Sequence, residues 1–162
     1  MSEEKNQEKS ALHLFLEANP AMFPDIPGGH GDGWNDVVLE ALKKLQALSA
    51  ETGVDIKIRQ IKEKFGGLRL YIQVVEEDSL EDLQVVEQTT EHVRLTPGAS
   101  AGSVRERAYA IVREAEDAAA ARCETCGASP GPLRNLGGYR CRMCDACLAK
   151  RGGEARDLRE TR

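Results

Sequence analysis

The sequence predicts an α+β protein in which an antiparallel hairpin or small sheet is covered by helices and is followed by a cysteine-rich C-terminal module. Three observations predict this fold class. Apolar residues recur at steps of three and four between residues 34 and 48, which is typical of a helix buried on one face. The period changes to two between residues 54 and 74, which is typical of strands. All five cysteines lie between residues 123 and 147.

The first 122 residues are interpreted as a charged, mobile N-terminus over residues 1–10 and one α+β domain over residues 11–122. A short helix is predicted from Ala11 and ends before Pro20. A loop rich in Gly and Pro follows, and we expect Asp32 at its end to cap the long helix. Gly53 stands where a left-handed stop of that helix is expected.

Two strands are predicted over residues 54–59 and 68–74, joined around the Phe65-Gly66-Gly67 turn. One face of this hairpin is apolar and needs helices to cover it. The preceding helix is one candidate, and a second helix is predicted from a capping box at Ser103 to about residue 122. Residues 76–102 between them are interpreted either as containing two further strands, over 83–88 and 92–96, or as an insertion.

The cysteine spacing predicts a zinc site. Two Cys-x-x-Cys pairs, Cys123 with Cys126 and Cys144 with Cys147, are separated by seventeen residues, which is within the range for four-cysteine zinc sites. Zinc takes four such ligands in a tetrahedron, so we expect one structural Zn²⁺ in a zinc-ribbon or treble-clef-like module. Four thiolates leave no position for a substrate or water, so this ion stabilises structure and performs no chemistry.

Cys141 leaves two alternatives open. A ligand set that ends in Cys141 and Cys144 would have fourteen residues between the pairs, just below the usual range, so we favour Cys147 as the fourth ligand. Two disulfides with one free cysteine are the other alternative, although five is an odd number for a secreted framework. The module is taken as residues 123–162, with a helix that starts at the second pair and a charged tail that is helical or frayed.

Composition and charge limit the classes of protein. With 41% hydrophobic and 30% charged residues, the chain is typical of soluble globular proteins. The first ten residues lack the apolar core of a signal peptide, and no run is long enough to span a membrane, so we expect a cytoplasmic protein. The net charge of −5 disfavours nonspecific binding of nucleic acid.

Five motifs follow one another along the chain: GDGW at 31–34, QIKEKFGGLR at 60–69, CETCG at 123–127, LGGY at 136–139 and CDAC at 144–147. This order resembles that of a group of small, mostly uncharacterised bacterial and phage-encoded proteins. The resemblance covers residues 31–147 and implies no activity. Residues 76–102 form a longer segment than the resemblance implies.

Candidate catalytic residues are few. His30 and Asp32 are neighbours in the glycine-rich loop and could act as a general acid or base. The simpler interpretation is an exposed loop histidine beside a helix cap, because no nucleophile or second histidine accompanies them. We therefore expect a protein that is not an enzyme.

Basic residues around the hairpin turn stand out in an otherwise acidic domain, and with the glycine-rich loop they predict an interaction surface. The candidate interaction residues are His30, Asp32, Trp34, Lys62, Lys64 and Arg69. The alternative is the solvated face of a two-stranded ribbon. The net charge favours a basic protein partner, as for an inhibitor, immunity or regulatory protein. A nucleic-acid-binding regulatory protein would instead combine the basic hairpin with Arg134, Arg140 and Arg142.

Overall fold

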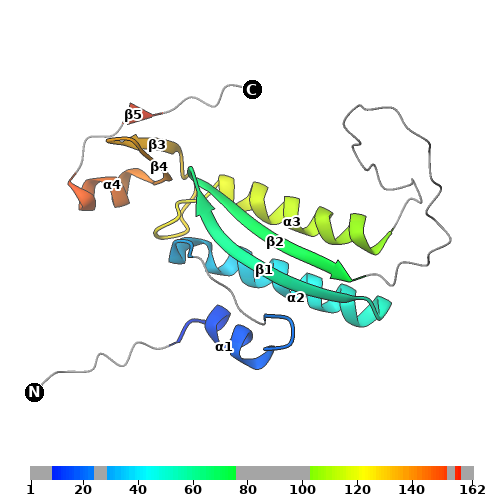
Figure 1. Cartoon of the computed structure of the whole chain (residues 1–162). Coiled ribbons are helices and arrows are strands. Elements are labelled where there is room, and N and C mark those ends of the chain that lie inside the picture. The colour runs from blue at the N-terminus through cyan, green and yellow to red at the C-terminus, as the bar shows by residue number, and fades with distance from the viewer. Residues whose placement is uncertain (1–8, 24–28, 76–102, 153–155, 158–162) are drawn as a thin grey trace, which may run out of the picture.

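The computed structural model describes residues 9–23, 29–75, 103–152 and 156–157 (Figure 1). Within these residues the predicted α+β fold class is confirmed, because helices accompany small antiparallel sheets. The elements in chain order are α1 (Ala11–Ala18), a short 3₁₀ helix (Asp32–Trp34), α2 (Asn35–Thr52), β1 (Asp55–Lys64), β2 (Gly67–Val75), α3 (Val104–Ala120), β3 (Leu133–Leu136), β4 (Tyr139–Arg142), α4 (Asp145–Arg151) and β5 (Arg156–Asp157).

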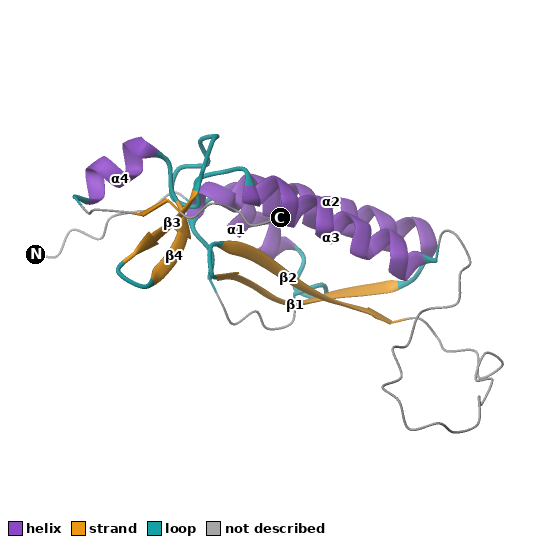
Figure 2. Ribbon diagram, turned by 90° about the horizontal axis from the view of Figure 1, so that it is seen from above, coloured by secondary structure: helices purple, strands orange, loops and turns teal. Residues whose placement is uncertain are grey.

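The main core lies between the β1–β2 hairpin and the helices α2 and α3, which cover one face of it (Figure 2). Leu42 and Leu45 of α2 and Ile56 and Ile58 of β1 are almost completely buried there. α3 contributes small side chains such as Ala108, so it approaches the hairpin closely. The predicted covering of the hairpin by these two helices is confirmed.

The ends of α2 and α3 follow from local sequence. Gly53 adopts a left-handed conformation with φ of 72° and ends α2, as predicted. The Ser103 hydroxyl accepts a hydrogen bond of 3.2 Å from the Glu106 amide and caps α3, as predicted. The prediction for Asp32 is wrong: Gly31 precedes the 3₁₀ helix, and the Asp32 carboxylate accepts instead from the Asn35 side chain.

β1 is longer than the sequence predicts, because it continues past Arg59 to Lys64. The register of its pairing with β2 shifts between Ile58 and Gln60, which marks a bulge at Arg59. The bulge returns Ile61 to the buried face that also holds Ile58. Strict alternation breaks at this point, so the period-two pattern of the sequence does not extend beyond Arg59.

Both edges of the hairpin are covered by other parts of the chain. On the β1 edge, the Ile58 amide donates to the Met22 carbonyl and the Glu63 amide donates to the Gly29 carbonyl, each at 2.9 Å. On the β2 edge, the Leu70 amide donates to the Glu116 carboxylate of α3 at 3.3 Å. Such contacts oppose edge-to-edge pairing with another chain, and they also place Gly29 beside β1.

Some predictions concern residues outside the described ranges, and the prediction for the C-terminal tail is corrected in part. The strands predicted near 83–88 and 92–96, and residues 1–8 of the N-terminus, lie outside the described residues. The tail is predicted to be helical or frayed; residues 153–155 and 158–162 lie outside the described residues, and the prediction is wrong only for Arg156 and Asp157, which form β5 and pair with β3 in an antiparallel three-stranded sheet. Among the helices of the described ranges, none is both long and apolar enough to cross a membrane.

Candidate metal centre

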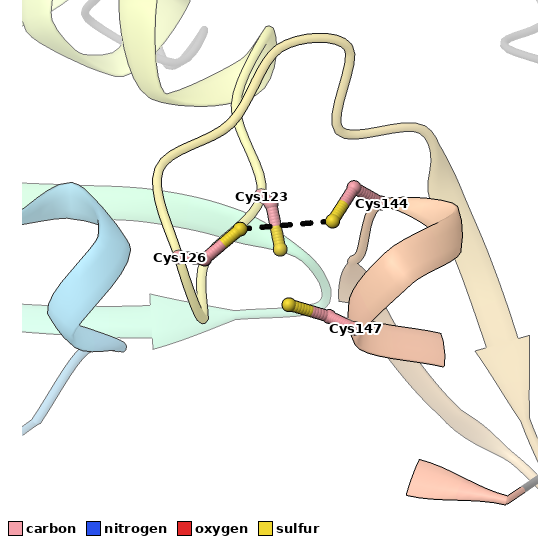
Figure 3. A group of neighbouring side chains, drawn as sticks. All are labelled: Cys123, Cys126, Cys144 and Cys147. Atoms are coloured by element: carbon pink, nitrogen blue, oxygen red, sulfur yellow. Dashed lines mark hydrogen bonds between the residues drawn. The ribbon is translucent and has the colours of Figure 1, made fainter. Parts of the chain in front are cut away.

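Four cysteines from two separate segments meet at one end of the hairpin core. Cys123 and Cys126 lie in the turn that follows α3. Cys144 is the N-cap of α4 and Cys147 lies in its first turn. The β3–β4 hairpin connects the two segments, and the side chains converge from both sides (Figure 3). A cysteine turn, a hairpin and a helix in this order form a treble-clef-like module.

The sulfur positions agree with a tetrahedral metal site. The four Sγ atoms all lie within 4.8 Å of one another, and the Sγ atoms of Cys126 and Cys144 are 3.6 Å apart. Zinc–sulfur bonds of about 2.3 Å place tetrahedral sulfurs about 3.8 Å apart. All five cysteines of the chain are free thiols. The structure thus brings together the four cysteines that the spacing selected, in a cluster compatible with a zinc-binding structural module.

Cys141 lies outside this cluster. It is part of β4, and its side chain is fully buried in a second, small core beside Cys123 and Met143. Burial there raises the pKa of the Cys141 thiol. Its position is that of a packing residue.

Two of the clustered thiols have strongly shifted pKa values. Burial opposes the ionisation of Cys123, but hydrogen bonds from the backbone amides of Cys144, Cys126 and Thr125 outweigh it and lower the pKa to about 6. The pKa of Cys147 rises to about 12, chiefly because its thiol is hydrogen-bonded to Cys126. Metal binding by cysteines requires the thiolate form, so a divalent cation bound at this cluster would stabilise the ionised thiols.

Arg134 forms hydrogen bonds with the residues on both sides of Cys144, in the second cysteine pair. Its guanidinium donates to the Met143 carbonyl at 2.6 Å and to the Asp145 carboxylate, on either side of Cys144. The side chain is only 7% exposed. The alternative that used Arg134 for nucleic acid is corrected on this point, because a buried guanidinium engaged with its own chain cannot reach phosphates. The sequence pattern contained no signal of this role.

The module contacts the hairpin turn through a second set of polar groups. The Tyr139 hydroxyl lies 3.4 Å from a carboxylate oxygen of Glu63 in β1 and 3.4 Å from one of Glu124. Burial raises the pKa of Glu124, and burial together with both carboxylates raises that of Tyr139 to about 12. Arg142 donates from Nε to the Gly66 carbonyl at 3.4 Å. The turn and the module are therefore joined directly.

The predicted interaction residues separate into two groups. Trp34 is fully buried, so its assignment to an interaction surface is wrong: the indole packs inside the protein. His30 is half-buried, its Nε2 lies 3.0 Å from Asn35 Oδ1, and burial lowers its pKa. Asp32 is exposed near it. The basic residues of the turn remain on the surface, and Lys62 pairs in register with Arg69.

The side of the hairpin that faces away from α2 and α3 is strongly basic, and we call it the basic face. It holds Lys57, Arg59, Lys62 and Lys64 together with the exposed rings of Phe65 and Tyr71. Arg69 lies at its edge, where its guanidinium is 3.9 Å from the Glu116 carboxylate of α3. Lys62 stacks over the ring of Tyr71 at 5.0 Å and Lys64 over that of Phe65 at 5.5 Å. Asp55 lies at the far end of this face and pairs with Lys57.

Comparisons of the chain with protein-family models, with curated proteins and with solved structures gave no match.

Proposed function

We propose that this chain is a non-catalytic protein that uses one structural zinc ion to stabilise its C-terminal module and binds another protein. The observation that carries the proposal is the cluster of Cys123, Cys126, Cys144 and Cys147, whose four sulfurs lie within 4.8 Å. A zinc ion held by four thiolates has no open position, so it stabilises structure. Such a site keeps its thiols best in a reducing compartment, which supports a cytoplasmic location.

Charge complementarity indicates the chemistry of the partner. The basic face stands out on a chain with a net charge of −5. In the described parts of the chain, Lys62 and Lys64 contact aromatic rings and form no ion pair with a carboxylate. Their ammonium groups could pair with the carboxylates of an incoming partner. An acidic protein segment with side chains that pack on Tyr71 and Phe65 would satisfy both the charges and the rings.

A nucleic acid is the second candidate, because exposed aromatic rings between lysines are also suited to stacking of unpaired bases. Tyr71 is 43% exposed and Phe65 is 70% exposed. One observation favours the protein partner. Of the three arginines assigned to nucleic acid in this alternative, Arg134 and Arg142 are engaged within the chain, which leaves only Arg140 for phosphates.

The test is site-specific photo-crosslinking in nuclease-treated lysate of the native host. A photoreactive phenylalanine analogue replaces Tyr71 on the basic face or, as the matched control, Tyr109 on α3. The two tyrosines are almost equally exposed, at 43% and 40%. We expect the probe at Tyr71 to capture a protein at an Asp- and Glu-rich peptide, and the probe at Tyr109 not to capture that protein.

Charge reversal provides the second arm. The variant with Lys62, Lys64 and Arg69 replaced by Glu should fold, take up zinc and lose the captured protein. A control with Lys43, Arg113 and Lys150 replaced by Glu carries the same net charge and should keep it. Fluorescence anisotropy with short single-stranded DNA and RNA at two salt concentrations tests the other candidate. Tight, salt-dependent binding that only the first variant loses would replace the protein partner by a nucleic acid.

A further inference from the structure

The GDGW segment of the N-terminal part lies directly against the first cysteine pair. The Gly33 amide donates to the Glu124 carbonyl at 2.9 Å. The indole Nε1 of Trp34 donates to the Arg122 carbonyl at 3.3 Å, across 88 positions of sequence. These two carbonyls flank Cys123 on either side. The backbone on both sides of Cys123 is thus fixed by hydrogen bonds from Gly33 and Trp34, which lie outside the module.

The contact leaves no space for side chains at two glycines. A Cβ atom added to Gly33 would lie 2.3 Å from the Cys123 carbonyl oxygen and 2.4 Å from the Gly127 amide nitrogen. A Cβ atom added to Gly31 would lie 2.0 Å from the Glu124 carbonyl oxygen. Each of these neighbours is backbone, which cannot rotate away as a side chain can. The close approach therefore requires glycine at both positions.

The turn that receives this contact is itself tightly closed. The Gly127 amide donates to the Cys123 carbonyl at 2.8 Å, and Gly127 has φ of 77°. A Cβ atom on Gly33 would also lie 2.8 Å from the Cys126 amide nitrogen. A side chain at position 33 would therefore press on the peptide groups that set the positions of Cys123 and Cys126.

We propose that Gly31, Gly33 and Trp34 are positioning residues of the metal centre, which brace the first cysteine pair and make metal retention depend on the N-terminal part of the chain. The inference rests on the zinc site proposed above. It gives the GDGW motif a role that neither a helix cap nor a partner surface supplies. Groups that orient metal ligands commonly affect metal affinity by about 10- to 100-fold.

The test compares two glycine variants of the full-length, zinc-loaded protein. Gly33→Ala should weaken zinc binding by about 10-fold or more, as measured by competition with a chromogenic chelator. Gly29→Ala is the matched control: it lies in the same loop, but among the described residues no atom beyond its chain neighbours lies within 4 Å of its added Cβ. We expect its zinc affinity to equal that of the wild type. A Gly33→Ala protein that folds and binds zinc as tightly as Gly29→Ala would overturn the inference.

Two further variants separate positioning from a general loss of stability. Trp34→Phe keeps most of the buried ring but removes the hydrogen bond to Arg122, so it should also release zinc more readily. If Gly33→Ala does not fold, the zinc affinity of Trp34→Phe tests the positioning role instead. Leu45→Ala weakens the main core far from the cysteines and should leave zinc affinity unchanged. Equal losses of affinity in Trp34→Phe and Leu45→Ala would contradict positioning. A wild-type chain that takes up no zinc would overturn the metal site itself, and this inference with it.

Trp34 supplies an independent readout, because it is the sole tryptophan of the chain. Its ring is fully buried against the cysteine turn. Removal of zinc by a chelator should loosen that turn and shift Trp34 fluorescence to longer wavelength, and added zinc should reverse the shift. Unchanged emission after complete removal of zinc would contradict the proposed coupling.

Discussion

At the scale of single residues, Cys141 and Cys147 show what decides a ligand. The two thiols are six positions apart, yet one fills a buried core and the other belongs to the four-sulfur cluster. Spacing alone favoured Cys147 without excluding Cys141. The difference arises from the β4 strand, which turns Cys141 into the small core, and from α4, whose first turn carries Cys147.

Removal of each thiol should therefore have a different result. Cys147→Ser should abolish stoichiometric zinc binding, because only three thiolates would remain. Cys141→Ala should retain one zinc per chain, with some loss of stability from the cavity it leaves. Elemental analysis of the purified variants measures both. Zinc lost from Cys141→Ala but kept in Cys147→Ser would reverse the assignment.

His30 provides a prediction for pH. Burial lowers the pKa of the folded-state ring, against the opposing effects of Asn35 and Asp32. The unfolded chain therefore takes up the proton more readily, so the contribution of His30 to stability is present above about pH 6.5 and is lost as the pH falls below it. Urea unfolding of the wild type and of His30→Gln should show the difference in their stability shifting against the wild type between pH 7.5 and 5.5. A constant difference would mean that His30 titrates alike in both states.

At the scale of elements, the long helix and the hairpin were predictable because each is periodic on its own. The stripe of α2 and the alternation of β2 are local properties of the sequence, and Gly53 and Ser103 mark helix ends by local chemistry. The bulge at Arg59 was not predictable, because its cause is the need to return Ile61 to the core. β5 likewise depends on β3, which is distant in sequence.

The packing of α2 on the hairpin gives a stability prediction. Leu45 is fully buried in the main core, so Leu45→Ala should lower the free energy of unfolding by about 2–5 kcal/mol. Lys43→Ala on the exposed side of the same helix should change it by no more than about 0.5 kcal/mol. Chemical denaturation measures both. Similar midpoints for Leu45→Ala and the wild type would contradict this packing.

At the scale of the whole molecule, the two least regular motifs join the N-terminal part to the cysteine module. Gly33 approaches the first cysteine pair, and Gly66 in the hairpin turn lies against the module, where an added Cβ would be 2.3 Å from Leu133 Cδ1. The sequence singled out both motifs as unusual, but could not show that they face the module. A contact across many residues has no local signature, whereas the two Cys-x-x-Cys pairs carry theirs in a fixed spacing.

The central claim is that one zinc ion, held by the four clustered cysteines, stabilises the module. The most direct measurement is the metal content of wild-type protein purified without added metal, by elemental analysis together with native mass spectrometry. The account predicts one zinc ion per chain, lost on treatment with a chelator and absent from Cys144→Ser. A folded, stable wild-type chain without metal and with two disulfides would contradict it.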